Sequence, residues 1–87
     1  MQILYTPHFK REAKRLPISL RSVVEARLAQ FAIDPRQPAL KVHKLDGRLK
    51  NFWAFSITAS IRVIFEFDGA DRAVFHSIGD HAIYDQF

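Results

Sequence analysis

The hydrophobic and polar positions follow a helical period in the first part of the chain. Residues 2–5 predict a short opening strand. Apolar residues then recur three or four positions apart over residues 8–16, which predicts an α-helix that Pro17 ends. Thr6 can cap this helix, with Pro7 in its first turn. Its other faces are basic, and we interpret them as exposed to solvent rather than as a binding surface.

A second helix is predicted from Leu20 to Ile33, because its apolar residues have the same spacing. Ser19 can cap its start, and a segment with two prolines, residues 34–38, ends it. Since a single proline separates the two helices, we expect a helical hairpin. The apolar stripe of the second helix consists of Leu20, Val23, Val24, Leu28, Phe31 and Ala32.

From residue 39 onward the apolar residues alternate, as they do in β-strands. Strands are predicted over residues 53–57, 61–67 and 73–78, and the last ends at Gly79. With the opening strand they make a mainly antiparallel sheet of four strands. The order of elements therefore predicts an α+β domain whose two N-terminal helices pack on one face of the sheet.

The register of the two central strands decides which face carries Arg62. A two-residue turn at Ala59 and Ser60 would pair Ile57 with Arg62 and mix polar with apolar residues on both faces. We prefer a loop with an odd number of residues, or a bulge, because it gives one apolar face. Arg62 then lies on the face away from the helices, where it is available to a ligand. The apolar face consists of Trp53, Phe55, Ile57, Ile61, Val63 and Phe65, and the other of Phe52, Ala54, Ser56, Thr58, Arg62 and Glu66.

The composition indicates one small folded domain, residues 1–87. An apolar share of 48% and a charged share of 25% argue against disorder. The absence of cysteine excludes disulfides and thiol catalysis and fits a cytoplasmic protein. We expect neither a membrane span nor a secretory signal. The net charge of +4 indicates an anionic partner, either a nucleic acid or an acidic protein.

Arg62 is the first candidate for chemistry, because it interrupts an apolar strand. A rigid strand would hold its guanidinium, a planar cation matched to phosphate oxygens, in a fixed position. The alternative is a structural ion pair with Glu66, which follows on the same face. The residue types alone support both alternatives equally.

Two further candidates, His81 and Tyr84, follow the last strand. His81 can exchange a proton near neutral pH, and Tyr84 can bond to a phosphate or stack on a base. The alternative, which the residue types favour, is that Ile83 and Tyr84 pack over the edge of the sheet. His76 lies inside a strand and is interpreted as structural.

A basic segment from His43, whose sequence H-K-L-D-G indicates a strand entering a turn at Gly47, supplies the remaining candidates. A neutral His43 can accept a proton from a ribose 2′-OH, and Lys44, Arg48 and Lys50 can bind phosphates. The alternative is an ordinary basic loop. The four histidines lack metal-ligand spacing, so we expect no metal and no other cofactor. Metal-free cleavage of a phosphodiester by the adjacent 2′-OH is the chemistry that these residues support best.

Three segments carry a resemblance to a known family. They are H-K-L-D-G-R-L from His43, W-A-F-S-I-T followed by I-R-V-I-F-E-F, and I-G-D-H-A-I-Y ending at Tyr84. In this order and spacing they resemble the RelE/ParE superfamily, the toxins of type II toxin–antitoxin modules. The resemblance implies two helices on a curved antiparallel sheet. It also implies either a ribosome-dependent mRNA endonuclease (the RelE, YoeB and YafQ branches) or an inhibitor of DNA gyrase (the ParE branch).

The resemblance assigns roles to several residues. Arg62 matches a phosphate-stabilising arginine of the RelE and YoeB branches. His81 matches a position that is a catalytic His in YafQ and an Arg in RelE, and Tyr84 lies near the family's C-terminal aromatic residue. His43 matches a His of the YafQ branch.

Other residues of the family pattern are missing. The strand lysines of the RelE branch are replaced over residues 54–56, and the YafQ branch has a second His near Ser56 and an Asp near Ser60. His43 is therefore our candidate for the general base, with Lys44 as the second choice.

Both functional alternatives imply a cognate antitoxin, which would offset the basic charge in a toxin–antitoxin hetero-oligomer. The endonuclease would also bind mRNA on the ribosome, and no membrane partner is expected. We favour the endonuclease over the gyrase inhibitor because His43 and His81 are present.

Overall fold

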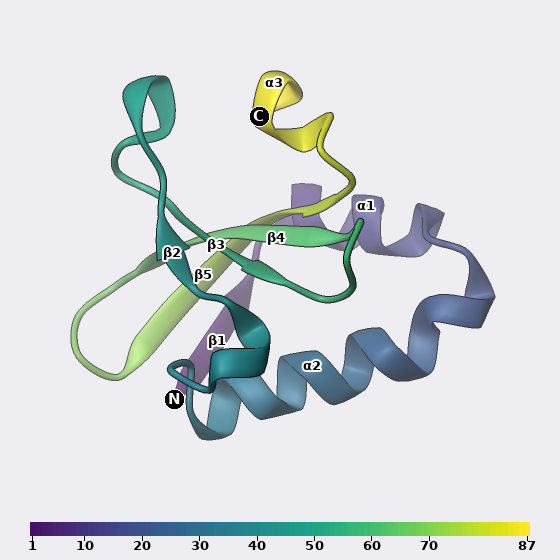
Figure 1. Cartoon of the computed structure of the whole chain (residues 1–87), viewed down its shortest axis with the longest axis horizontal. Helices are drawn as coiled ribbons and strands as arrows, with labels where there is room; N and C mark the ends of the chain where they lie inside the picture. Colours follow the sequence, from purple (N-terminus) through teal and green to yellow (C-terminus); the bar gives the residue numbers. More distant parts are fainter.

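A five-stranded sheet forms the centre of the structure, and helices lie on both sides of it (Figure 1). This computed structural model describes the whole chain, residues 1–87. The strands are β1 (Gln2–Tyr5), β2 (His43–Lys44), β3 (Trp53–Ser56), β4 (Arg62–Phe67) and β5 (Arg72–Gly79). The α-helices are α1 (Pro7–Arg15), α2 (Arg21–Ile33) and α3 (Ile83–Gln86), and short 3₁₀ turns occur at Ile18–Leu20, Pro38–Leu40 and Gly47–Leu49. None of the helices is long and apolar enough to cross a membrane.

The strand order across the sheet is β1-β5-β4-β3-β2. β1 pairs in parallel with β5, and the other neighbours are antiparallel. The predicted α+β class is confirmed, but the predicted number of four strands is wrong. The additional strand, β2, consists of two residues, and it lies in the segment from His43 that the sequence indicates as extended chain entering a turn but that is not among the four predicted strands of the sheet.

The start of α1 is as predicted, whereas the start of α2 is not. The Thr6 hydroxyl accepts a hydrogen bond from the Phe9 N–H at 3.1 Å. Ser19 does not cap α2, because it lies inside the 3₁₀ turn that precedes this helix. Leu20 occupies the N-cap position, and its own N–H donates to the Pro17 carbonyl at 2.9 Å. Backbone bonding in the turn thus replaces the expected side-chain cap.

The register of β3 and β4 is as predicted from the apolar pattern. Ser56 lies opposite Arg62, and the loop between the strands consists of residues 57–61. Thr58 Oγ1 holds this loop by accepting a hydrogen bond from the Ile61 N–H at 3.1 Å. Because the loop has an odd number of residues, the apolar side chains share one face and Arg62 lies on the other.

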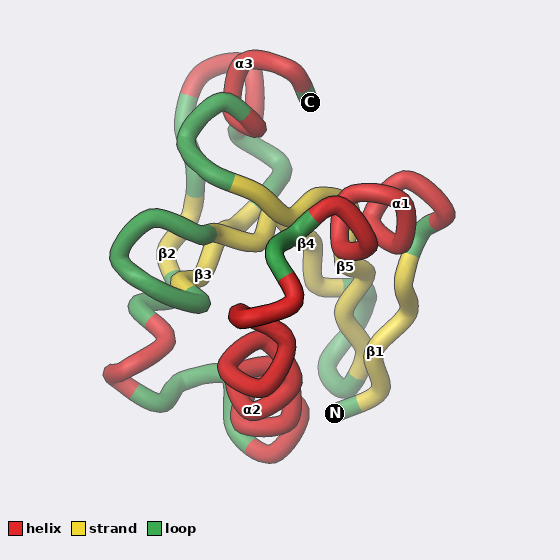
Figure 2. Tube along the Cα trace, turned by 90° about the vertical axis from the view of Figure 1, so that its right-hand side faces the viewer, coloured by secondary structure: helices red, strands yellow, loops and turns green.

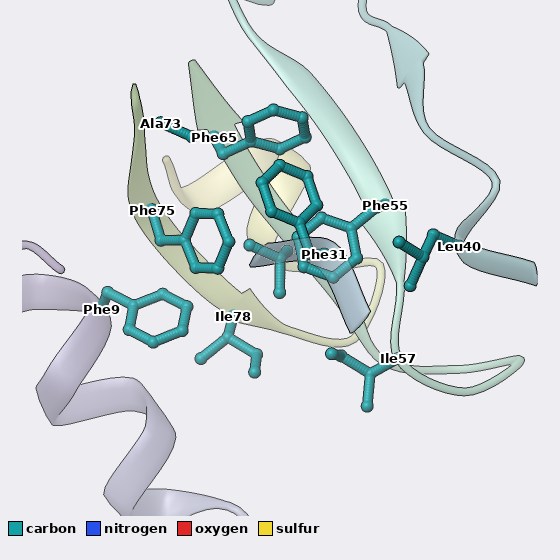
Figure 3. Packing of buried hydrophobic residues seen from close by; sticks show 10 residues of the cluster. Phe9, Phe31, Leu40, Phe55, Ile57, Phe65, Ala73, Phe75 and Ile78 are labelled. Atoms are coloured by element: carbon teal, nitrogen blue, oxygen red, sulfur yellow. The ribbon is translucent and has the colours of Figure 1, made fainter. Parts of the chain in front are cut away.

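Phe31 of α2 is at the centre of the main core (Figure 3). Its side chain is fully buried. Its ring centroid lies 4.8 Å from that of Phe55, 4.9 Å from that of Phe65 and 5.0 Å from that of Phe75. A single helical residue therefore packs against β3, β4 and β5. Truncating a phenylalanine buried in this way to alanine costs about 3–5 kcal/mol. Phe9, Leu40, Ile57, Val63, Ala73 and Ile78 complete this cluster.

The face of the sheet away from α2 is partly covered by the C-terminal segment, and α2 and α3 lie on opposite sides of the sheet (Figure 2). Ile64 packs there against Leu49 and Ile83, and all three are buried. The rings of Phe52 and Phe87 meet edge to face over the same cluster, 5.0 Å apart. The expectation that this face is open therefore holds only around Arg62.

A carboxylate from α1 completes the hydrogen bonding along the outer edge of β5. β1 pairs with only the first four residues of β5. Beyond them, Glu12 Oε1 accepts a hydrogen bond from the Ile78 N–H at 3.1 Å and one from the Ser77 hydroxyl at 2.6 Å. His8 Nε2 lies 3.2 Å from the same carboxylate oxygen. Glu12 thus ties α1 to the strand from which the C-terminal segment continues.

We predict that Glu12→Ala lowers the free energy of unfolding by about 2–3 kcal/mol, because the buried Ser77 hydroxyl and the Ile78 N–H lose a charged acceptor. Urea denaturation measures this loss. Glu25→Ala, on the exposed side of α2, is the matched control and should cost less than about 0.5 kcal/mol. Equal losses in the two variants would contradict the role of Glu12.

Candidate active site

One open hollow on the sheet face away from α2 collects side chains from separate parts of the chain. β2 supplies His43, β3 supplies Ser56 and β4 supplies Arg62. His81 and Tyr84 come from the segment that follows β5. This hollow, here called the Arg62 hollow, has a volume of about 560 Å³, and Lys41 and Leu45 complete its lining. The four residues predicted to be catalytic therefore lie around a single hollow.

Strand pairing explains why these residues meet. His43 pairs with Ala54, which pairs with Ile64. Directly paired residues share a face of a sheet, and so do residues two positions apart on a strand. His43 therefore lies on the same face as Arg62. Gly79 pairs with Arg62 at the end of β5, so the chain that continues from it carries His81 to the same place.

Arg62 is held by neutral partners and keeps an unpaired charge. Its Nη1 donates to Ser56 Oγ at 2.8 Å and to the Thr58 carbonyl at 3.2 Å. The predicted alternative of an ion pair with Glu66 is wrong, because Glu66 Oε1 instead lies 2.8 Å from His76 Nε2. Glu66 is four positions along the strand from Arg62, about 13 Å away, beyond easy reach of the two side chains. The guanidinium is thus fixed in position and free to bind an anion.

His43 has one ring nitrogen engaged and the other available. Its Nδ1 lies 2.9 Å from the Lys41 carbonyl oxygen. A carbonyl oxygen can only accept, so Nδ1 carries the proton in this contact. In the neutral imidazole Nε2 is then the acceptor, as a general base requires. The backbone of Lys41 is left-handed, with φ of 52°. Residues other than glycine rarely adopt this strained conformation.

His81 and Tyr84 are positioned by close packing of the C-terminal segment on β5. Their ring centroids are 5.7 Å apart. Ile83, between them in sequence, is buried and packs on Gly79. A Cβ at Gly79 would lie 2.6 Å from Ile83 Cγ2, so only glycine leaves room for this approach. The predicted packing of this segment is therefore present, and it leaves Tyr84 at the hollow. Ile83 packs on the sheet, and Tyr84 contacts the same cluster and also lines the hollow.

The three basic residues predicted to bind RNA do not line the Arg62 hollow. Lys44 pairs with Trp53, which faces the main core, and so lies on the opposite face from His43. This placement removes Lys44 as the alternative base. Arg48 donates to the carbonyls of Tyr84 and of Phe87, the latter at 3.0 Å, and so ties down the C-terminal segment. Lys50 is exposed beyond the hollow.

Lys41 is a lining residue that the sequence analysis missed. A signal was present: Lys41, His43 and Leu45 are spaced two apart, the period that puts side chains on one face of an extended segment. The prolines just before this segment concealed it, because they indicate a loop.

Arg62 and Lys41, the two cations that line the Arg62 hollow, form no ion pair within the protein. Burial raises the pKa of the Tyr5 phenol, but Tyr5 lies on β1, outside the hollow. No group of three or more His, Cys, Asp or Glu side chains in the chain is arranged to hold a metal ion.

Solved structures match this fold over almost its whole length. YafQ from E. coli strain BL21(DE3) matches with a TM-score of 0.76 and 16% identity, covering 95% of this chain and 96% of that one. The YoeB/ParE toxin from Agrobacterium tumefaciens has a TM-score of 0.74 and 18% identity, covering 93% and 99%. The toxin–antitoxin complex RelBE2 from Mycobacterium tuberculosis has a TM-score of 0.65 and 17% identity, covering 92% and 96%. No family sequence model and no curated protein matches the chain.

These likenesses show that the chain has the fold of bacterial RelE/ParE-type toxins. The toxin-like fold that the sequence motifs implied is therefore confirmed, although its sheet has five strands and one parallel pairing. Within it, the chain is similar to YafQ and to the YoeB/ParE toxin over more than nine-tenths of its length.

We predict that Arg48→Ala releases the C-terminal segment and lowers the free energy of unfolding by about 1–2 kcal/mol, because two carbonyls lose a charged donor. Urea denaturation measures the loss, and the NMR signals of residues 81–87 should shift or broaden. Lys50→Ala removes the same charge two residues away and should change neither quantity. Unchanged signals in Arg48→Ala would show that the segment does not depend on this contact.

Proposed function

We propose that this protein is the toxin of a toxin–antitoxin pair and acts as a metal-independent endoribonuclease on mRNA in the ribosome. The observation that carries the proposal is the arrangement of His43, Arg62, His81 and Tyr84 around one hollow. A base, a phosphate-binding cation and a second proton-transfer group are what cleavage by an adjacent 2′-OH requires.

The proposed reaction uses each of these groups once. His43 Nε2 takes the proton of the ribose 2′-OH as the oxygen attacks the neighbouring phosphorus. Arg62 stabilises the added negative charge on the phosphorane. Protonated His81 gives its proton to the departing 5′-oxygen, which leaves a 2′,3′-cyclic phosphate and a 5′-hydroxyl. Tyr84 bonds to the phosphate or stacks on the neighbouring base.

An antitoxin partner is supported by the comparisons and by the charge. Structures with this fold include complexes described as toxin–antitoxin pairs, the DinJ–YafQ complex of E. coli and RelBE2. The net charge of +4 favours an acidic partner. A ribosomal target would place the protein in the cytoplasm.

We predict that Arg62→Ala lowers the rate of mRNA cleavage about 100-fold or more, because the phosphorane loses a fixed charged donor. The rate is measured in a single turnover on ribosomes with a vacant A site, and primer extension of cellular mRNA after brief induction gives the same comparison in vivo. Arg36→Ala, an exposed arginine after α2, is the matched control and should cleave at the wild-type rate.

Two results would contradict the proposal. One is wild-type cleavage by Arg62→Ala. The other is gyrase-linked DNA breaks with intact mRNA after induction of the wild-type protein, which would favour the gyrase inhibitor.

We also predict that His43→Ala and His81→Ala each slow the single-turnover cleavage about 100-fold, the usual contribution of a general base or acid. His8→Ala, which changes an exposed histidine on α1, serves as the control and should retain the wild-type rate. If the His43 variant cleaves as fast as the His8 variant, another group is the base.

A further inference from the structure

A second hollow lies beside the Arg62 hollow and shares part of its wall. Its volume is about 390 Å³. Lys41, Ser56 and Arg62 line both hollows, so the Arg62 side chain stands between them. On the far side the second hollow is bounded by Arg27 of α2 and by Thr58 of the loop between β3 and β4. We call it the Arg27 hollow.

Three cations converge on the Arg27 hollow, and no carboxylate lines it. Arg27, Lys41 and Arg62 come from α2, from the segment before β2 and from β4, which are distant in the sequence. The ion pairs of the protein all involve other residues. Most basic residues of this chain are unpaired too, so it is the convergence that distinguishes these three. Three like charges around one hollow repel one another, and a bound anion would offset that repulsion.

Two of the cations are restrained rather than free to move away from one another. Arg27 is half-buried, and its Nη1 donates to Gln30 Oε1 at 2.9 Å. Arg62 is held by Ser56 and Thr58, as described above. A charged side chain that is already ordered loses little entropy when it binds a ligand. The arrangement therefore suits an anion that is held in place.

We propose that the Arg27 hollow binds the RNA phosphate next to the one that is cleaved. This inference rests on the proposed function, because it takes the Arg62 hollow as the place of cleavage. Consecutive phosphates belong to neighbouring nucleotides. A single RNA strand that crosses the Arg62 side chain would therefore place one phosphate in the Arg62 hollow and the next in the Arg27 hollow. The ligand of the Arg27 hollow is thus a phosphodiester of single-stranded RNA, and its contacts set the position of the strand without reading bases.

The test measures binding of the whole protein to ribosomes that carry an mRNA with a 2′-O-methyl ribose at the cleavage site, so that the RNA is not cut. Arg27→Ala should weaken binding about tenfold, the loss of one charged phosphate contact. A neutral methylphosphonate at one of the two linkages adjacent to the protected one should weaken wild-type binding by a similar factor. The same linkage should have no further effect on Arg27→Ala.

Arg21→Ala is the matched control, since it removes an exposed arginine from the same helix outside this hollow. Arg27→Gln, which keeps a polar side chain, guards against a folding defect, and thermal unfolding is measured for all variants. The inference is overturned if Arg27→Ala and Arg21→Ala bind the ribosome complex with the same affinity. It is also overturned if, at both linkages, the methylphosphonate weakens binding of Arg27→Ala as much as it weakens binding of the wild-type protein.

Cleavage of unmodified mRNA is measured in parallel. If the wild-type protein cleaves mRNA but Arg27→Ala does not weaken binding, the proposed function stands and only the Arg27 subsite is overturned. If the wild-type protein does not cleave mRNA, the proposed function itself is overturned.

Discussion

The packing of Phe31 against the aromatic face of the sheet is the contact on which the rest of the structure depends. It joins α2 to β3, β4 and β5 at once, through Phe55, Phe65 and Phe75. Because that face must stay toward α2, the polar residues of the same strands lie on the other face. Arg27 is one helical turn before Phe31, so the same contact also sets where its guanidinium lies at the end of the sheet. Core and candidate site are therefore consequences of one arrangement.

The candidate site is assembled from short, separately restrained pieces. The loop of residues 57–61 has an odd number of residues and so decides which face of the sheet carries Arg62. Its Thr58 carbonyl also holds the Arg62 guanidinium. The strained backbone at Lys41 presents its carbonyl to His43. Gly79 lets the C-terminal segment turn back closely over the sheet. Each device fixes one functional group, which matters because general acid–base chemistry and charge stabilisation require groups that are in position before the substrate arrives.

Apart from the Ser19 cap, sequence reasoning succeeded where the signal was local or periodic, and it failed where a partner was distant. The helical stripe around Phe31, the Thr6 cap and the β3–β4 register all follow from spacing within about a dozen residues. The strand β2 is only two residues long, and its place at the edge of the sheet depends on its pairing with β3. The pairing of Glu66 with His76 rather than Arg62 depends on the alignment of β4 and β5, which no periodicity reveals.

The sequence by itself determined the class of fold, the face of the sheet on which Arg62 lies, and the candidates His43, His81 and Tyr84. Side-chain period and turn length are local properties, so they can be read along the chain. Only the tertiary structure decided that Arg48 binds the C-terminal carbonyls and that Lys41 and Arg27 join Arg62. Long basic side chains look alike in sequence, and their partners are chosen by which segments the core packing brings together.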